Sequence, residues 1–349
     1  MQKRINAFVK LGEFLSQFSR SGIDKKENIA NNDLFFDGFK HQIKLAEENN
    51  SWFTKENILF SIESWSKALT TENISKWTSD VSSQNSNKKV AIIMAGNIPL
   101  VGFHDFLSVL ISGHSVLVKQ SSSDKNLMPF LTKYLEYVEP DFKGKIEFTE
   151  GKLTDYDAVI ATGSNNTARY FEHYFKEKPS IIRKNRNSVA VLTGKESETE
   201  LANLSDDVFQ YFGLGCRSVS KLFVPKGYNF DAFFNGMYTK KEIVNNAKYA
   251  NNYDYNKAVY LMSLFDLLEN GFLMIKEDES YSSPIATVFY EYYSDENELK
   301  EKLNIDAHKI QCVVSNGILD SEIEFGQTQN PQLWDYADGI NTLDFLAKI

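Results

Sequence analysis

The sequence is poor in the residues that build metal sites and disulfide frameworks. Its 349 residues include only two cysteines and five histidines, and no metal-ligand spacing surrounds either cysteine. This pattern argues against both a disulfide-stapled fold and a structural zinc site. No H-E-x-x-H or comparable histidine pair is present either, so we expect no metal.

Long hydrophobic runs and an excess of positive charge are also missing. No apolar run reaches the roughly 18 residues that a membrane-spanning helix requires. Residues 1–18 carry apolar side chains at helical spacing instead of a signal-peptide core. The formal net charge is −9, which gives no overall attraction to nucleic acid or to an anionic membrane. We expect a cytoplasmic protein without stable membrane insertion and without a nucleic-acid partner.

The order of apolar patterns predicts the fold class. The first eighty or so residues have helical spacing, and a Ser- and Asn-rich stretch, 78–89, is expected to be a linker. Beyond it, short apolar runs typical of buried parallel strands alternate with helical patterns across short connections. Strands are expected at 90–95, 114–120, 145–150, 156–163, 187–194, 218–225, 284–293 and 308–315, and helices also at 206–212 and over most of 230–268. This alternation predicts an α/β protein with a mostly parallel, doubly wound sheet.

Two strand ends are candidate nucleotide-binding sites, although no G-x-G-x-x-G fingerprint follows any expected strand. In "VIATGS" a strand ends at Gly163, and Ser164 is placed to cap the next helix, whose N-terminus suits a pyrophosphate. Lys119 lies at the carboxyl end of another strand, the usual ligand side of an α/β sheet. Each has a plain alternative: a simple helix cap for Ser164, and a solvated strand-end lysine for Lys119.

Asn97 follows the first expected strand, in "AGNIP", where Pro99 stiffens the turn. An amide fixed at this position can donate a hydrogen bond to a developing oxyanion. The alternative is ordinary turn chemistry, because Asn is a standard turn residue. His104 is the only histidine close to it in sequence.

Cys216 lies in "QYFGLGCRSVS", where two glycines permit a loop that presents the sulfur closely to a substrate. Arg217 is adjacent and could favour the thiolate, which is the form that attacks. Cys312, in "KIQCVVS", is instead expected to be a buried strand residue. The two interpretations of Cys216, nucleophile or structural thiol, are about equally supported by this stretch.

The ordered set Asn97, Lys119, Gly163–Ser164 and Cys216 resembles the aldehyde dehydrogenase superfamily. Those enzymes have an Asn after a strand, a Lys in a K-P-S-E-like segment, a Gly-Ser after a strand and then a loop Cys. The similarity runs from about residue 88 to the C-terminus. Within the superfamily, "GLGCRSVSKLFVP", "NNYDYNKAVYLM" and "DYADGINTLDFL" are most similar to the LuxC-type acyl-CoA reductases, which supply fatty aldehyde in bacterial bioluminescence.

Two departures from the superfamily pattern refine what the resemblance implies. Relatives that oxidise to free acids carry a glutamate general base before the cysteine, but no acid lies between Ile181 and Leu192 here. Without a base to activate water, a thioacyl-enzyme is not readily hydrolysed by that route, which favours reduction. Ser122 replaces the glutamate that holds ribose hydroxyls in NAD-dependent relatives, and the loss of that carboxylate removes repulsion against a 2′-phosphate.

The resemblance therefore implies an NADPH-dependent reductase of acyl-CoA, long-chain acyl groups being favoured, that forms fatty aldehyde through a thioacyl-enzyme on Cys216. Asn97 is implied as the oxyanion donor. NADH is the alternative cofactor. The resemblance also implies that Lys119, Ser121, Ser122, Gly163 and Ser164 bind the cofactor.

Two other functions stay open. One is a short-chain acylating aldehyde dehydrogenase or a glutamyl-phosphate-type reductase. The other is a non-catalytic nucleotide- or acyl-CoA-binding protein with the same fold. The superfamily also implies a homo-oligomer, a dimer or a tetramer. The expected organisation is a helical segment (1–80), an NADP-binding domain (81–189), a catalytic domain (190–325) and a segment returning to the body or to a partner subunit (326–349).

Overall fold

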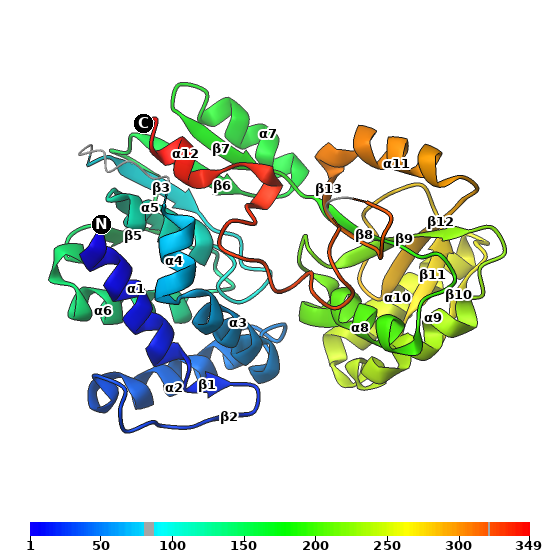
Figure 1. Ribbon diagram of the computed structural model, residues 1–349, viewed down its shortest axis with the longest axis horizontal. Coiled ribbons are helices and arrows are strands. Elements are labelled where there is room, and N and C mark those ends of the chain that lie inside the picture. The colour runs from blue at the N-terminus through cyan, green and yellow to red at the C-terminus, as the bar shows by residue number, and fades with distance from the viewer. Residues whose placement is uncertain (80–86, 320–321) are drawn as a thin grey trace. The chain divides into compact units, whose positions relative to one another are not determined.

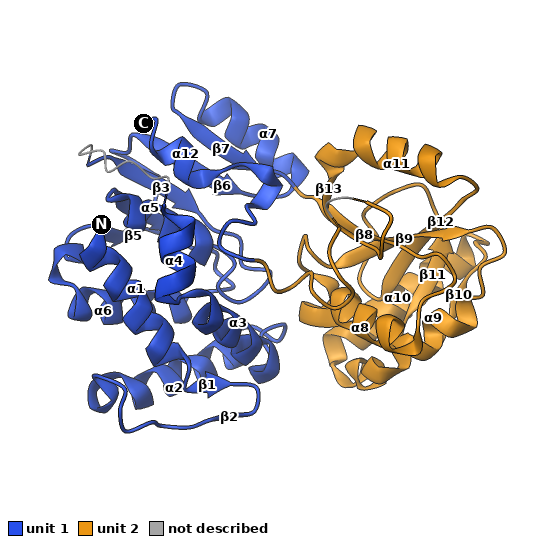
Figure 2. Cartoon of the chain, viewed as in Figure 1, with its two compact units in different colours: residues 1–184, 332–349 blue, residues 185–331 orange. Residues whose placement is uncertain are grey.

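The structure is a computed structural model that describes residues 1–79, 87–319 and 322–349. Most of the expected linker, residues 80–86, lies outside these ranges. The described chain forms two compact units (Figure 2), which are unit 1, Met1–Lys184 with Gln332–Ile349, and unit 2, Asn185–Pro331.

Unit 1 is built around a parallel sheet of strand order β5-β4-β3-β6-β7 (Figure 1). The strands are β3 (Lys89–Ile93), β4 (Ser115–Lys119), β5 (Ile146–Phe148), β6 (Ala158–Thr162) and β7 (Ser180–Arg183). Val90, Ala91 and Ile92 in β3 are all fully buried, as expected of a strand covered on both faces. The helices that connect these strands are α5 (Phe103–Ser112), α6 (Leu127–Val138) and α7 (Asn165–Tyr174).

The N-terminal helices complete the core of unit 1. They are α1 (Gln2–Leu15), α2 (Asn32–Asn49), α3 (Lys55–Ala68) and α4 (Thr71–Trp77), with a short hairpin of β1 (Phe18–Ser19) and β2 (Gly22–Ile23). Their buried side chains form one hydrophobic cluster with those of α5 and α6. The C-terminal helix α12 (Thr342–Leu346) joins the same cluster and packs against α5, although the two helices are far apart in sequence.

Unit 2 contains a second sheet, of order β10-β11-β12-β9-β8-β13, in which only the edge strand β10 runs antiparallel to its neighbour. The strands are β8 (Asn187–Val191), β9 (Val219–Pro225), β10 (Leu268–Glu269), β11 (Met274–Glu277), β12 (Thr287–Tyr293) and β13 (Ile310–Val314). The helices are α8 (Glu198–Phe209), α9 (Phe230–Met237), α10 (Ala247–Met262) and α11 (Glu296–Ile305).

The predicted strands and the mostly parallel α/β fold are confirmed, with two corrections. The predicted helix before the cysteine loop is present, but its bounds of 206–212 are wrong. Helix α8 begins earlier, after a capping box in which Ser197 and Glu200 exchange hydrogen bonds, and it ends at Phe209. Strands β7 and β11, each four residues long, and β1, β2 and β10, each two residues long, were not predicted. Strands this short give no periodicity that distinguishes them from a loop.

Candidate active site

The carboxyl edge of the sheet in unit 1 brings most of the candidate residues together. From β3 the chain winds to β4 and β5 on one side and then to β6 and β7 on the other, so the strand order reverses between β3 and β6. In open parallel sheets, ligands bind outside the carboxyl ends of the strands at such a reversal. Lys119 ends β4 at this edge, and the loops that carry Asn97 and Gly163–Ser164 begin there.

Asn97 lies in the loop between β3 and α5, and this loop is closely packed. A Cβ atom on Gly96 would lie 2.5 Å from the Cβ and Oγ of Ser121, so only glycine lets the loop approach the one after β4 this closely. The hydroxyl of Ser61 donates to the carbonyl oxygen of Pro99, 2.9 Å away. The backbone that carries the Asn97 amide is therefore held from two sides.

A buried carboxylate, not singled out from the sequence, also holds the Asn97 loop. Leu100 adopts a left-handed backbone conformation (φ 59°), and its N–H donates to Oδ2 of Asp124 at 3.1 Å. Asp124 is 7% exposed, and among the described residues its Oδ1 has no hydrogen-bond partner. Burial raises the pKa of Asp124 to about 6, although the hydrogen bond from Leu100 acts in the opposite direction. Asp124 thus joins the loops that follow β3 and β4.

Lys119 ends β4, as the sequence predicted, and its ammonium group donates to the carbonyl oxygen of Gly151 at 2.9 Å. Ser121 accepts a hydrogen bond from the N–H of Ser123 at 3.2 Å, and Ser122 is exposed. These contacts place all three candidates on the carboxyl edge of the sheet. Their roles toward a cofactor stay predictions.

Ser164 caps α7, as expected, by accepting a hydrogen bond from the N–H of Thr167 at 3.3 Å. A Cβ on Gly163 would lie 3.0 Å from the side chain of Thr167, so the turn into the helix is tight. The first turn of α7 carries no acidic residue, in contrast to the first turns of α8 and α11. Its positive dipole end is therefore not neutralised by carboxylates of the same turn, which suits an anionic group.

Cys216 lies in unit 2, at an exposed corner of a tight turn. The N–H of Ser218 donates to the carbonyl oxygen of Gly215 at 3.0 Å, so Cys216 and Arg217 are the two central residues of a β-turn. The hydroxyl of Ser188, on β8, donates to the carbonyl oxygen of Cys216 at 3.0 Å. The turn is thereby fixed to the sheet while the thiol stays on the surface of the unit.

Three consecutive residues before the turn adopt left-handed backbone conformations. The φ angles are 55° at Tyr211, 59° at Phe212 and 74° at Gly213. For a residue other than glycine this conformation costs about 1–2 kcal/mol. Tyr211 is buried, and the ring of Phe212 packs 6.2 Å from that of Tyr249. This packing stabilises the reversal of the chain that lies between the end of α8 and the turn that contains Cys216.

Arg217 points its guanidinium toward β13. Its Nη1 donates to Sγ of Cys312 at 3.1 Å and to the carbonyl oxygen of Thr328 at 3.4 Å. Cys312 is buried in the strand, as the sequence predicted. These contacts anchor the second corner of the cysteine turn. The effect of Arg217 on the Cys216 thiolate stays a prediction.

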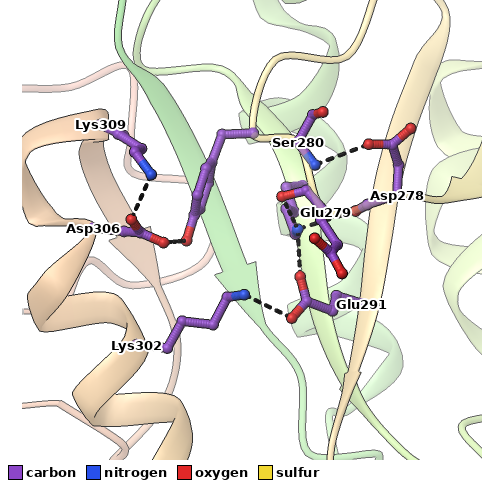
Figure 3. A network of polar contacts seen from close by, with 9 residues as sticks. Asp278, Glu279, Ser280, Glu291, Lys302, Asp306 and Lys309 are labelled. Carbon is purple, nitrogen blue, oxygen red and sulfur yellow. Dashed lines mark hydrogen bonds and ion pairs between the residues drawn. The ribbon is translucent and has the colours of Figure 1, made fainter.

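A buried lysine fixes the strand that follows the turn. Lys221 on β9 is fully buried, and its Nζ donates to Glu291 Oε2 at 2.7 Å and to the carbonyl oxygens of Asp278 and Glu279 at 3.0 and 2.8 Å. Lys302 pairs with the same glutamate at 2.8 Å (Figure 3). Burial lowers the pKa of Lys221, against the opposing effect of Glu291. The network holds β9, β12 and the loop between β11 and β12 together.

His104 and Arg183, which lies in the acid-free segment 181–192, have structural roles in unit 1. His104 Nε2 lies 2.9 Å from the carbonyl oxygen of Leu333. Arg183 pairs with Asp105 at 2.6 Å, and it donates to Thr342 Oγ1 at 3.1 Å. The histidine and the arginine therefore fasten the C-terminal segment to α5 and β7.

The structure thus places Asn97, Lys119, Ser121, Ser122, Gly163 and Ser164 on one sheet edge of unit 1, and Cys216 in unit 2. Sequence reasoning missed Asp124, whose partner is distant in the chain.

Within the described ranges, no three His, Cys, Asp or Glu side chains gather as metal ligands. No helix there is long and apolar enough to cross a membrane.

Comparison with solved structures identifies the class of fold. An indole-3-acetaldehyde dehydrogenase complexed with NAD⁺ matches 89% of this chain and 71% of its own, with a TM-score of 0.65 and 14% sequence identity. The aldehyde dehydrogenase KauB from Pseudomonas aeruginosa matches 90% and 72%, with a TM-score of 0.63 and 14% identity. The fold is therefore that of an aldehyde dehydrogenase.

The family is shown by sequence. The model of the acyl-CoA reductase (LuxC) family matches residues 46–233, more than half of the chain and including both Asn97 and Cys216. The chain belongs to this family, and it is an oxidoreductase of aldehyde chemistry. Among curated proteins, none matches the chain by sequence.

Proposed function

We propose that the protein reduces acyl-CoA, preferentially with a long acyl chain, to fatty aldehyde with NADPH. The observation that carries the proposal is the presentation of Cys216, an exposed thiol at the corner of a hydrogen-bonded turn preceded by three left-handed residues. Strained backbone of this kind is retained where it serves a site. A structural thiol, such as that of Cys312, is buried instead.

The residues on the sheet edge of unit 1 fit a dinucleotide. The acid-free N-terminus of α7 with its Gly163–Ser164 turn suits a pyrophosphate. Lys119 ends β4, and we infer that it contacts ribose hydroxyls or a phosphate of the cofactor. Ser121 and Ser122 offer hydroxyls where a carboxylate would repel a 2′-phosphate. When bound, the nicotinamide supplies a hydride. A neighbour of the same fold is complexed with NAD⁺, which supports a nicotinamide cofactor and leaves NADH as the alternative.

In the proposed reaction the Cys216 thiolate attacks the thioester carbonyl of acyl-CoA. The Asn97 amide and the Cys216 backbone N–H donate to the oxyanion, and the C–S bond to CoA breaks with release of the CoA thiolate. Reduction of the resulting thioacyl group by a hydride gives a thiohemiacetal. Its collapse releases aldehyde and returns the Cys216 thiol. The absence of an acid in 181–192 supports this route, because no residue of that segment can activate water against the thioacyl group.

The test is NADPH oxidation measured with acyl-CoA of increasing chain length, together with detection of aldehyde. The wild type and Cys312→Ala are expected to consume NADPH, whereas Cys216→Ala is not. Asn97→Ala is expected to lower kcat about a hundredfold, the usual effect of losing one oxyanion donor. Activity in Cys216→Ala would reject the mechanism.

Other results of the same assay would support the alternative functions. Turnover with short acyl groups or acyl phosphates only would favour the acylating dehydrogenase or glutamyl-phosphate-type reductase. Binding of NADPH or acyl-CoA without turnover would favour the non-catalytic protein. Association into a dimer or tetramer stays a prediction, to be measured by light scattering.

A further inference from the structure

A second buried carboxylate lies behind the turn that carries Cys216. Asp207, on α8, has no exposed surface, yet its oxygens accept three hydrogen bonds. Oδ2 accepts from the N–H of Gly326 at 2.6 Å. Oδ1 accepts from the N–H and the hydroxyl of Thr328 at 2.9 and 2.8 Å. All three donors come from residues 326–330, which we call the clamp loop, so Asp207 fixes the backbone of this loop against α8.

The clamp loop in turn holds the cysteine turn. Gln329 Nε2 donates to Ser218 Oγ at 3.3 Å, and Arg217 donates to the carbonyl oxygen of Thr328 at 3.4 Å. Arg217 and Ser218 directly follow Cys216 in the turn. These hydrogen bonds therefore connect Asp207 on α8, through the clamp loop, to Arg217 and Ser218, the two residues that follow Cys216.

Keeping the buried side chain of Asp207 ionised costs free energy. Burial raises the pKa of Asp207 to about 6, although the hydrogen bonds from Gly326 and Thr328 favour the charged form. Its neighbour Asp206 raises the pKa slightly further and pairs with Lys240 at 2.5 Å on the surface. A buried charge retained at such a cost is poorly explained by stability alone. A carboxylate at this position can accept all three hydrogen bonds, from the N–H of Gly326 and from the N–H and hydroxyl of Thr328.

We propose that Asp207 is a positioning residue for Cys216: by holding the clamp loop, it fixes the turn that directs the thiol toward the acyl carbonyl. The kinetic consequence rests on the proposed function. Misplacement of a nucleophile by about 1 Å lowers the rate by about a hundredfold. In the part of the chain that the structure describes, the clamp loop is hydrogen-bonded to the cysteine turn and not to any candidate cofactor residue. Loss of Asp207 is therefore expected to lower kcat and to leave the KM for NADPH unchanged.

The experiment compares Asp207→Asn with Asp206→Asn, which removes a neighbouring half-exposed carboxylate. Asn keeps the shape and the acceptor for Thr328, but it places an NH₂ group against the N–H of Gly326. Hydrogen exchange of peptides covering 213–220 and the clamp loop is followed by mass spectrometry. Asp207→Asn is expected to speed exchange of the Ser218 amide at least tenfold and to lower kcat at least tenfold, with the KM for NADPH within about twofold. Asp206→Asn is expected to match the wild type in each.

The two readouts separate failure of this proposal from failure of the proposed function. Exchange in 213–220 that is the same in Asp207→Asn and in the wild type overturns the positioning role, whatever the activity. A wild type that reduces no acyl-CoA overturns the proposed function, while the exchange comparison still decides the role of Asp207. If Asp207→Asn does not fold, Gln329→Leu removes the link from the clamp loop to Ser218, one of its two links to the cysteine turn. It is expected to speed exchange in 213–220 without affecting α8, and unchanged exchange in this variant also overturns the proposal.

Discussion

The guanidinium of Arg217 donates to the sulfur of Cys312, 3.1 Å away, so the residue next to one cysteine is bound to the other. The two thiols nevertheless differ in access. Cys216 is exposed at the corner of its turn, whereas Cys312 is 5% exposed within β13. This difference separates a thiol that can react from one that supports the turn.

The first prediction follows from this difference in access. In the folded protein, iodoacetamide is expected to modify Cys216 at least a hundredfold faster than Cys312, because alkylation needs an accessible thiolate. Peptide mapping by mass spectrometry after timed quenching measures both rates in one sample. Unfolding in urea provides the control, since both thiols should then react alike. Equal rates in the folded protein would contradict the assignment.

The second prediction concerns the attachment of the C-terminal segment to unit 1. The side chains of Arg183 and Asp105 are 6% and 10% exposed. Asp105→Asn is expected to lower the free energy of unfolding by about 3 kcal/mol, because a buried guanidinium loses its counter-charge. Urea titration measures the loss, and hydrogen exchange in 337–346 should accelerate. Asp141→Asn, which breaks an exposed pair with Lys3, serves as the control and should leave the urea midpoint unchanged.

A third prediction tests the buried network of unit 2. Lys221→Met is expected to lower the free energy of unfolding by about 3 kcal/mol, because the carbonyl oxygens of Asp278 and Glu279 lose their donor inside the protein. Lys302→Met, which removes a half-exposed partner of the same glutamate, should cost less. Urea titration of both variants decides the matter. Equal losses would show that the ammonium of Lys221 contributes no more than a surface charge.

Much of the fold was predictable, because a strand buried on both faces leaves a continuous apolar run. Strands β3, β4, β6 and β8 were found in this way. The local cap at Ser164 was also predictable, because its partner is three residues away. The partners of Asp124 and Asp207 are 24 and about 120 residues away, and no local pattern links them. The reversal at Tyr211 and Phe212 was hidden for another reason: residues that rarely adopt left-handed conformations give no sign that they do so.

The fourth prediction uses the pKa of Asp124, which burial raises to about 6 from an ordinary value of 3.8. The folded state thus binds the proton more tightly than the unfolded state, so this group costs stability at neutral pH and the cost shrinks as the pH falls through 6. In Asp124→Asn the Oδ1 can still accept from Leu100, but the charge is gone. Between pH 7.5 and pH 5, the free energy of unfolding of the wild type is expected to gain about 1 kcal/mol relative to this variant. Urea titrations of both proteins at the two pH values measure the difference, and a difference that is constant or of opposite sign would contradict the raised pKa.

The fifth prediction concerns cofactor choice and depends on the proposed function. Ser122 is exposed on the loop after β4, beside Ser121, whose side chain contacts the Asn97 loop at Gly96. Ser122→Glu introduces the carboxylate that NAD-dependent relatives carry at this position. The new side chain is expected to repel the 2′-phosphate of NADPH and to accept hydrogen bonds from the ribose hydroxyls of NADH. The ratio of kcat/KM for NADPH to that for NADH should fall at least tenfold. Ser123→Glu adds the same charge one residue further along and is expected to change the ratio much less, which separates a specific contact from a general field. A ratio that moves equally in both variants would place the 2′-phosphate elsewhere, because a charge acting only through the field does not distinguish neighbouring exposed positions.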